Sequence, residues 1–132
     1  VRTAITGADI PIYGEGSNVR DWLYVGDHCR ALDLAYRHAP PGSQYVIGGG
    51  NEYSNLILAR HICHQLDDIH PRRDGRPYQE QIRLVPDRPG HDYRYAVDAT
   101  KIRETLQWAP QASFEASLAK TIAWHLEQNK DA

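Results

Sequence analysis

Residues Val19–Asp27 read VRDWLYVGD, a strand pattern that leads directly into the start of a helix. Apolar residues alternate with polar and aromatic ones along this run, which predicts a strand over residues 19–25. Asp27 is a favourable N-cap or first-turn residue, and the pattern after it predicts a helix that continues to about His38. A strand that passes so closely into a helix indicates a fold in which the two alternate.

The segments on either side continue this alternation. Gly7 is placed to close a short helix that begins near Arg2. Ser54 and Ser113 are suitable N-caps for two longer amphipathic helices. We further expect a helix from Asp98 to Leu106, a solvated arginine-rich loop over residues 71–78, and strands over residues 11–13, 44–48, 82–85 and 95–97. The order predicts a mixed α/β fold.

The composition is that of a globular protein. Of the 132 residues, 41% are apolar and 24% are charged, as in soluble domains. The net charge of -2 argues against non-specific nucleic-acid binding, and no apolar run is long enough to span a membrane. We therefore expect a cytoplasmic protein without a nucleic-acid or membrane partner. Cys29 and Cys63 occur in partly apolar helical patterns, which favours reduced core thiols over a disulfide.

The chain begins with Val1 and contains no methionine. It reads as if cut from something longer. We expect residues 1–132 to form one domain, or one part of a larger domain.

A charged turn, DRPGHD, occupies residues Asp87–Asp92. Its central proline and glycine predict a tight turn that directs Arg88 and His91 toward the same side. Together with Arg20, two arginines from separate segments match the charge and geometry of a diphosphate. A surface turn whose charges pair among themselves explains the same residues.

Asp21 lies on the apolar face of the predicted strand. Burying a carboxylate there is costly unless other groups donate hydrogen bonds to it. A backbone amide or an arginine close to Asp21 is therefore the expected partner.

The glycine run Gly48–Asn51 follows a predicted strand and precedes a helix, where a backbone can approach a ligand closely. It does not fit a dinucleotide fingerprint, because Tyr53 occupies the position of the next required glycine. His61 and His64 are three residues apart on one predicted helix, yet no further ligands have zinc-site spacing. Helix-surface histidines are the preferred explanation, and no metal site is predicted.

Five motifs occur in a fixed order along the chain, namely PIYG (11–14), VRDWLYVGDH (19–28), YVIGGGNE (45–52), DRPGHDYRYAVDATKI (87–102) and LQWAP (106–110). In these motifs the chain resembles the C-terminal third of the dTDP-glucose 4,6-dehydratase family, lyases of the extended short-chain dehydrogenase/reductase class. The RPGH turn followed by RYAVD favours this family over nucleotide-sugar epimerases and decarboxylases.

The resemblance implies a role in holding a nucleotide sugar such as dTDP-glucose. It places Arg20 and Arg88 on the diphosphate, with help from Asn51 and His91. It places Tyr13 against the thymine, in a pocket shaped by Pro11 and Ile12.

The resemblance also implies what this chain does not carry. Full-length relatives bind NAD in a Rossmann domain and use a Tyr-x-x-x-Lys pair for catalysis. No tyrosine here is followed by a lysine four residues later. We therefore expect no catalytic residue, no NAD bound by this chain, and no activity of the chain alone.

Two alternative functions stay open, namely a stand-alone non-catalytic module that binds nucleotide sugars or proteins, and a fragment of a CDP- or GDP-sugar dehydratase. In the family, the helix after Asp27 and the strand near Tyr45 pack against the NAD domain. We expect these surfaces to be uncovered here and the chain to form a homo-oligomer through them.

Overall fold

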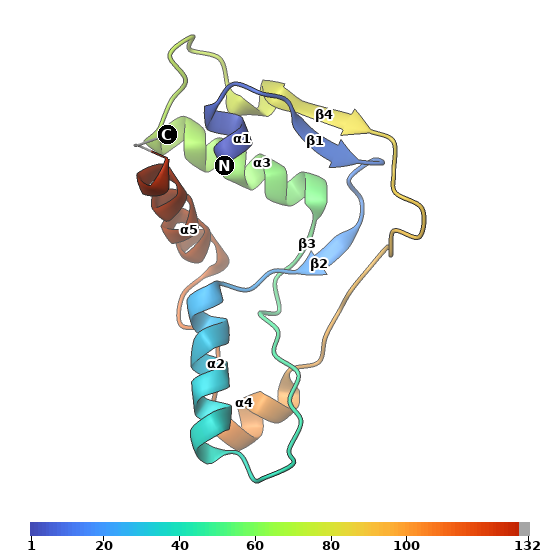
Figure 1. Cartoon of the computed structure of the whole chain (residues 1–132), viewed down its shortest axis with the longest axis vertical. Helices are drawn as coiled ribbons and strands as arrows, with labels where there is room; N and C mark the ends of the chain where they lie inside the picture. The colour runs from blue at the N-terminus through green and yellow to red at the C-terminus, as the bar shows by residue number, and fades with distance from the viewer. Residues whose placement is uncertain (130–132) are drawn as a thin grey trace.

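The computed structural model describes residues 1–129. Its elements follow in the order α1 (Arg2–Ile5), β1 (Ile10–Tyr13), β2 (Val19–Asp21), α2 (Val25–His38), β3 (Glu52–Ser54), α3 (Asn55–Ile69), the 3-10 helix η1 (Tyr78–Gln81), β4 (Ile82–Val85), α4 (Thr100–Leu106) and α5 (Phe114–Gln128). Figure 1 shows α1, α3, α5 and the strands β1 and β4 in the wider part of an elongated molecule, and α2 and α4 in its narrower part. The mixed α/β prediction is confirmed.

Two small sheets connect segments that are far apart in the sequence. Strands β1 and β4 pair in parallel, from Ile10 opposite Ile82 to Tyr13 opposite Val85. Strands β2 and β3 pair antiparallel. Because β1 and β4 run in parallel, their carboxyl ends lie side by side, and Gly14 N donates a hydrogen bond to Val85 O at 2.8 Å. The loops that leave these strands therefore start from the same place.

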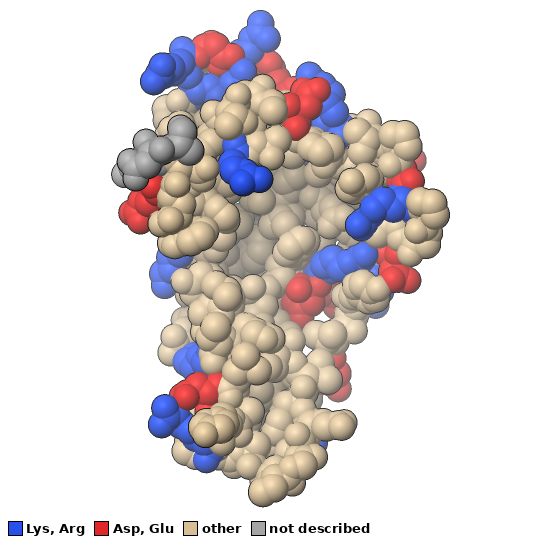
Figure 2. All heavy atoms as spheres, in the orientation of Figure 1, with Lys and Arg blue, Asp and Glu red and all other residues tan. Residues whose placement is uncertain are grey.

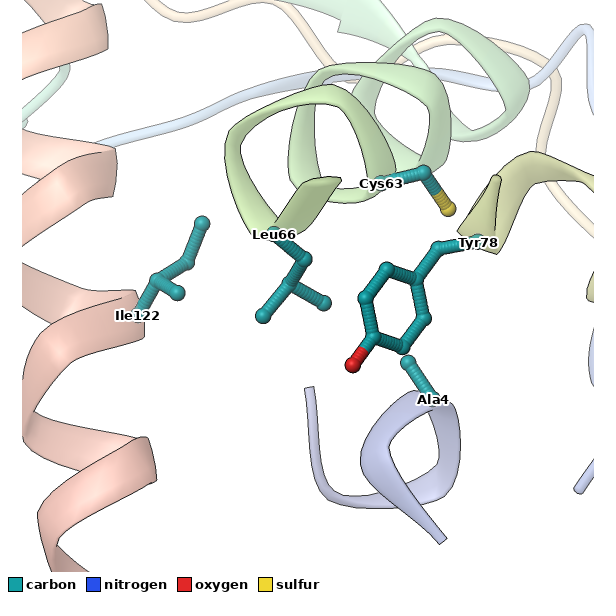
Figure 3. Packing of buried hydrophobic residues seen from close by; sticks show 5 residues of the cluster. All are labelled: Ala4, Cys63, Leu66, Tyr78 and Ile122. Carbon is teal, nitrogen blue, oxygen red and sulfur yellow. The ribbon is translucent and has the colours of Figure 1, made fainter. Parts of the chain in front are cut away.

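The first core cluster joins three helices and η1. Figure 3 shows Leu66 and Cys63 of α3 facing Tyr78 of η1, with Ala4 of α1 and Ile122 of α5 beside them. The Tyr78 hydroxyl donates to His70 O at 3.0 Å, which satisfies its polar end inside the core. Burial raises the pKa of the Cys63 thiol to about 11, so this thiol stays protonated and inert.

The second core cluster joins α2 to α4. It contains Ala31, Ala99, Ile102 and Trp108, all at most 5% exposed. The Trp108 Nε1 donates to Asp27 O at 3.1 Å. The Asp27 carboxylate accepts from Gln111 N and from Arg30 Nη2, both at 3.1 Å. Asp27 is thus a first-turn acid, as predicted, and it also holds the segment after α4 against α2.

Most of the predicted helix ends are confirmed. The Ser54 and Ser113 side chains accept hydrogen bonds from Ile57 N and Ala116 N, as N-caps do. Gly7 takes the left-handed conformation, with φ of +76°. None of the helices within residues 1–129 is long and apolar enough to cross a membrane.

Three strand predictions were wrong in extent or kind. Strand β2 ends at Asp21 instead of Val25, because helix α2 already begins at Val25. The Val25 side chain, predicted to lie on the apolar face of the strand, is 67% exposed. Residues 44–48 form no strand, since no strand in the described part of the chain pairs with them. Residues 95–97 form no strand either, and only an isolated bridge pairs Arg94 with Val19.

Some burial predictions were also wrong. The predicted solvated loop is confirmed for residues 71–77, but Tyr78, the first residue of η1, is 1% exposed because it fills the first core cluster. Cys29 is exposed and only Cys63 is a core thiol, although both are free. Trp108 is buried in the second core cluster, whereas Trp124 on α5 is 55% exposed.

Replacing Gly16 by alanine tests the turn between β1 and β2. Gly16 has a φ of +69°, and an added Cβ would lie 2.6 Å from Ile12 Cγ2 and 2.8 Å from Leu56 Cβ. Gly42 has a φ of +80° with nothing within 4 Å of an added Cβ. We expect Gly42→Ala to lower the free energy of unfolding by about 1 kcal/mol, the cost of the left-handed backbone. Gly16→Ala should lower it by about 3 kcal/mol, because overpacking is added.

Urea denaturation followed by circular dichroism measures both variants. Equal losses for the two glycines would contradict the close packing of Gly16 against β1 and α3.

Candidate anion-binding site

A shallow pocket of about 370 Å³ brings together the two charged segments singled out in the sequence. One wall comes from β2 and the other from the loop between β4 and α4. The bridge at Val19 holds the walls together, because Val19 N donates to Tyr93 O at 2.8 Å and Tyr95 N donates to Val19 O at 3.1 Å. The lining residues are Arg20, Arg88, Pro89, Gly90, His91, Asp92 and Tyr95.

Arg20 is held in place by three contacts. Its Nη1 donates to Val19 O at 2.7 Å, and its Nη2 donates to Asp92 O at 2.9 Å. Its guanidinium carbon lies 4.4 Å from the centre of the Tyr95 ring, a cation–π distance. The side chain is therefore oriented by neutral carbonyls and an aromatic face, which leave its positive charge uncompensated.

Arg88 is arranged in a similar way on the other wall. Its guanidinium carbon lies 4.9 Å from the centre of the Tyr13 ring, at the end of β1. Tyr13 is 42% exposed. Tyr13 lines a neighbouring apolar hollow together with Pro11, Ile12 and Trp22, and it is not among the residues that line the arginine pocket. Figure 2 shows a recess in the upper half of the visible face, where few charged side chains occur.

Asp87 organises the turn that carries Arg88. Its Oδ1 accepts from His91 Nδ1 at 2.7 Å and from Arg88 N at 2.8 Å. The His91 hydrogen bond, followed by the Arg88 amide, lowers the pKa of the Asp87 carboxyl below 3.8. An ionised carboxylate only accepts hydrogen bonds, so Nδ1 of His91 must carry the proton. The His91 side chain is 4% exposed and forms part of the pocket wall.

Gly14 makes room for Asp87. It has a φ of +57°, and a Cβ on Gly14 would lie 3.0 Å from Asp87 Oδ2. The glycine of the PIYG motif thus lets the ends of β1 and β4 come together. This contact places Tyr13 next to Arg88, the member of the stack that lines the pocket.

The charges of the turn pair only in part. Asp87 pairs with His91 at 2.7 Å, and Arg94 pairs with Glu52 at 2.7 Å. Within residues 1–129, neither Arg20 nor Arg88 takes part in an ion pair. Self-pairing therefore explains Asp87 and His91 but leaves both pocket arginines available for an anion.

Asn51 does not line this pocket. Its Nδ2 donates to Trp22 O at 3.2 Å, and its backbone amide donates to Asp21 Oδ1 at 2.8 Å. Gly50 N donates to Asp21 Oδ2 at 3.2 Å. The predicted hydrogen-bonded role of Asp21 is confirmed, whereas a contact between Asn51 and substrate stays a prediction from the resemblance.

The same contacts decide whether the glycine run fits a dinucleotide. A Cβ on Gly48 would lie 2.5 Å from Asp21 Oδ2, and one on Gly49 would lie 2.6 Å from Trp22 O. The glycines therefore allow close approach of the chain's own Asp21, whose carboxylate accepts the amides that a pyrophosphate would need. This loop does not fit the phosphates of NAD.

The histidines on α3 make protein contacts. His61 lies 5.5 Å from the Tyr53 ring and 5.8 Å from the Phe114 ring, and His64 Nδ1 lies 3.4 Å from Asp68 Oδ2. In the part of the chain that the structure describes, no group of three or more metal-binding side chains occurs.

Sequence reasoning missed two residues of the site. Tyr95 was assigned to a strand, and its place beneath Arg20 depends on the bridge at Val19. Asp87 was seen only as one charge of a turn. A signal for Asp87 existed in its spacing of four residues from His91, although the sequence alone does not show that the two side chains meet.

Solved structures share this arrangement of elements. The dTDP-glucose 4,6-dehydratase of Bacillus anthracis, solved in complex with NAD, matches with a TM-score of 0.83 and 36% identity, covering 98% of this chain and 38% of that one. The Streptomyces venezuelae enzyme of the same name matches with a TM-score of 0.84 and 36% identity, over 98% of this chain and 37% of that one. A UDP-glucose 4-epimerase from Thermotoga maritima matches with a TM-score of 0.79 and 28% identity, over 96% of this chain and 37% of that one. The fold is that of the C-terminal part of extended short-chain dehydrogenase/reductase enzymes that act on nucleotide sugars.

Sequence comparison narrows this class. A family model described as GDP-mannose 4,6 dehydratase matches residues 1–121, and the chain belongs to this family. The dTDP-glucose 4,6-dehydratase 1 of Escherichia coli K12 is 47% identical over 98% of the chain, and its Xanthomonas campestris counterpart is 44% identical over 96%. The chain spans about 36% of the length of these curated relatives.

The lowered pKa of Asp87 predicts a specific dependence of stability on pH. A carboxyl whose folded pKa is lowered stabilises the fold above its unfolded pKa, and this contribution is lost as the pH falls through the folded value. We expect Asp87→Asn to be less stable than the original chain at about pH 7, and the gap to narrow as the pH falls below the usual aspartate pKa of about 3.9. Urea denaturation across this range measures the gap. A gap of constant size would show that ionised Asp87 does not stabilise the turn.

Proposed function

We propose that the chain is the substrate-binding part of a dTDP-glucose 4,6-dehydratase, with the diphosphate of the nucleotide sugar bound between Arg20 and Arg88. The observation that carries this proposal is the meeting of these two arginines in one pocket, where neither takes part in an ion pair within residues 1–129. Guanidinium groups bind phosphate oxygens through paired donors, and two of them balance the charge of a diphosphate.

The surroundings of the arginines support an anion at this place. Both guanidinium groups are stacked on tyrosine rings, which restricts their motion before a ligand arrives. A preorganised side chain loses less entropy on binding. The buried His91, held by Asp87, adds a polar wall next to Arg88.

The base is assigned to the side of Tyr13. This ring is partly exposed at the end of β1, and Pro11 and Ile12 lead from it into the apolar hollow that Trp22 also lines. An aromatic face beside an apolar wall suits a planar base. The order diphosphate, then Tyr13, then Pro11 and Ile12 gives the orientation in which the nucleotide is proposed to bind.

The chemical step is assigned to residues outside this chain. The Tyr-x-x-x-Lys pair is absent from the sequence, and the glycine run is occupied by Asp21. We therefore propose that the chain alone does not convert dTDP-glucose to its 4-keto-6-deoxy product. Its contribution is to bind and orient the nucleotide.

Calorimetric titration with dTDP tests the proposal. We expect saturable binding that is weakened about tenfold or more by Arg20→Ala and by Arg88→Ala, because each removes charged hydrogen bonds to the diphosphate. Arg37→Ala is the matched control, since Arg37 lies on α2 and pairs with Asp33 at 2.8 Å. CDP, UDP and GDP are titrated in parallel. GDP is the most informative competitor of dTDP, because the matching family model is described as GDP-mannose 4,6 dehydratase.

The outcomes separate the alternatives. Preference for dTDP that both pocket variants abolish supports the dehydratase assignment. Preference for GDP or CDP would move the chain to another nucleotide-sugar dehydratase. Binding that Arg37→Ala weakens as much as the pocket variants do would refute the proposed site, as would a folded chain that binds none of the nucleotides.

We also propose that the chain self-associates through its uncovered apolar face. On α2, Leu32 is 52% exposed and Tyr36 is 91% exposed, and Val46 in the unpaired segment 44–48 is 49% exposed. An extended segment without a strand partner and an apolar helix face are common pairing surfaces. Sedimentation velocity should show a dimer or larger species whose fraction rises with concentration and falls in Leu32→Lys. A monomer at all concentrations would contradict self-association.

A further inference from the structure

The anion pocket contains an acid that ought to oppose its function. Asp92 lies in the pocket wall, and its backbone carbonyl accepts a hydrogen bond from Arg20 Nη2 at 2.9 Å. A carboxylate so near a free guanidinium would normally form an ion pair with it. Such a pair would occupy Arg20 with an internal anion and add negative charge where a phosphate is to bind.

The structure shows this carboxylate turned to another partner. The Tyr95 hydroxyl donates a hydrogen bond to Asp92 Oδ2. The same Tyr95 ring lies under the Arg20 guanidinium, so one side chain contacts both charged groups. Arg20 meets only the main-chain carbonyl of Asp92, and its positive charge stays uncompensated.

Backbone contacts fix Tyr95 in this position. Tyr95 N donates to Val19 O at 3.1 Å, and Val19 directly precedes Arg20 in the sequence. Asn18 Nδ2 donates to Asp92 O at 3.2 Å, which anchors the other end of the short segment. The hydrogen bond to Asp92 raises the pKa of the Tyr95 hydroxyl above its usual value of 10. The hydroxyl therefore keeps its proton and remains a donor at neutral pH.

We propose that Tyr95 is a positioning residue of the anion site, whose hydroxyl holds the Asp92 carboxylate away from Arg20 and so keeps Arg20 free for the phosphates. The inference rests on the proposed function of the pocket and adds a residue to it. Its distinctive element is the hydroxyl group, since the aromatic ring alone would still stack under Arg20. Without the hydroxyl, Asp92 becomes an internal competitor for the ligand.

Three variants of the full 132-residue chain separate this role from simple packing. Tyr95→Phe keeps the ring and removes the donor, and should weaken dTDP binding about fivefold, the scale of an exposed ion pair. Asp92→Asn removes the competitor and should bind dTDP at least as tightly as the original chain. The double variant should regain most of the affinity that Tyr95→Phe lost. Tyr53→Phe on β3, whose ring lies 4.5 Å from the Phe114 ring, is the matched control and should leave the affinity unchanged.

The same variants supply a readout without ligand. A crystal structure of Tyr95→Phe should show a carboxylate oxygen of Asp92 within about 4 Å of an Arg20 nitrogen, the distance of an ion pair. Circular dichroism verifies that each variant is folded.

Several results would overturn the inference. Unchanged dTDP affinity in Tyr95→Phe would overturn it. A loss of affinity in Tyr95→Phe that the added Asp92→Asn does not restore would also overturn it, because the hydroxyl would then act only through local structure. A Tyr95→Phe structure with Asp92 still turned from Arg20 would also refute it. These outcomes differ from failure of the proposed function, in which the original chain itself does not bind dTDP and both proposals fall together.

Discussion

Two backbone hydrogen bonds of Val19 connect the whole site. They join β2 to the segment after the DRPGHD turn, at 2.8 Å to Tyr93 O and 3.1 Å from Tyr95 N. Without them, strand β2 with Arg20 and the loop with Arg88 would depend on side-chain contacts for their relative position. With them, Arg20 lies on the Tyr95 ring and opposite the turn that carries Arg88. Main-chain bonds of this kind do not depend on side-chain identity, so the scaffold can keep its geometry while the pocket residues change.

The second constraint is the parallel pairing of β1 and β4, which the first core cluster supports from behind. Tyr78 and Cys63 fill the space between α3 and η1, and η1 leads directly into β4. The strand pair then delivers Tyr13 and Asp87 to the same edge. Apart from Arg20 on β2, the pocket is thus lined by loop residues whose starting points are set by packed elements, a common arrangement in binding proteins.

The sequence predicted the helices well and the strands poorly. Capping residues such as Ser54 and Ser113 act locally, so their signals can be read without knowing the fold. A strand needs a partner, and residues 44–48 have none in the described range 1–129. Arg20 and Arg88 were identified as a candidate pair through chemistry and resemblance, and the structure brings them together. The contacts of Tyr95 and the diversion of Asn51 to Trp22 O were not accessible, because both depend on long-range pairing.

The glycine run around Asp21 has a consequence for how such chains evolve. Gly48 is required by the chain's own Asp21 carboxylate, which accepts the Gly50 and Asn51 amides as an external phosphate does in nucleotide loops. Substitutions at Asp21 and Gly48 are therefore coupled. A side chain at Gly48 would displace the Asp21 carboxylate, and loss of this carboxylate would leave the Gly50 and Asn51 amides unpaired. In an alignment of descendants the two residues would be retained as a block and be mistaken for a cofactor signature. The loop thus carries an intramolecular mimic of a ligand, bound through Gly50 N and Asn51 N.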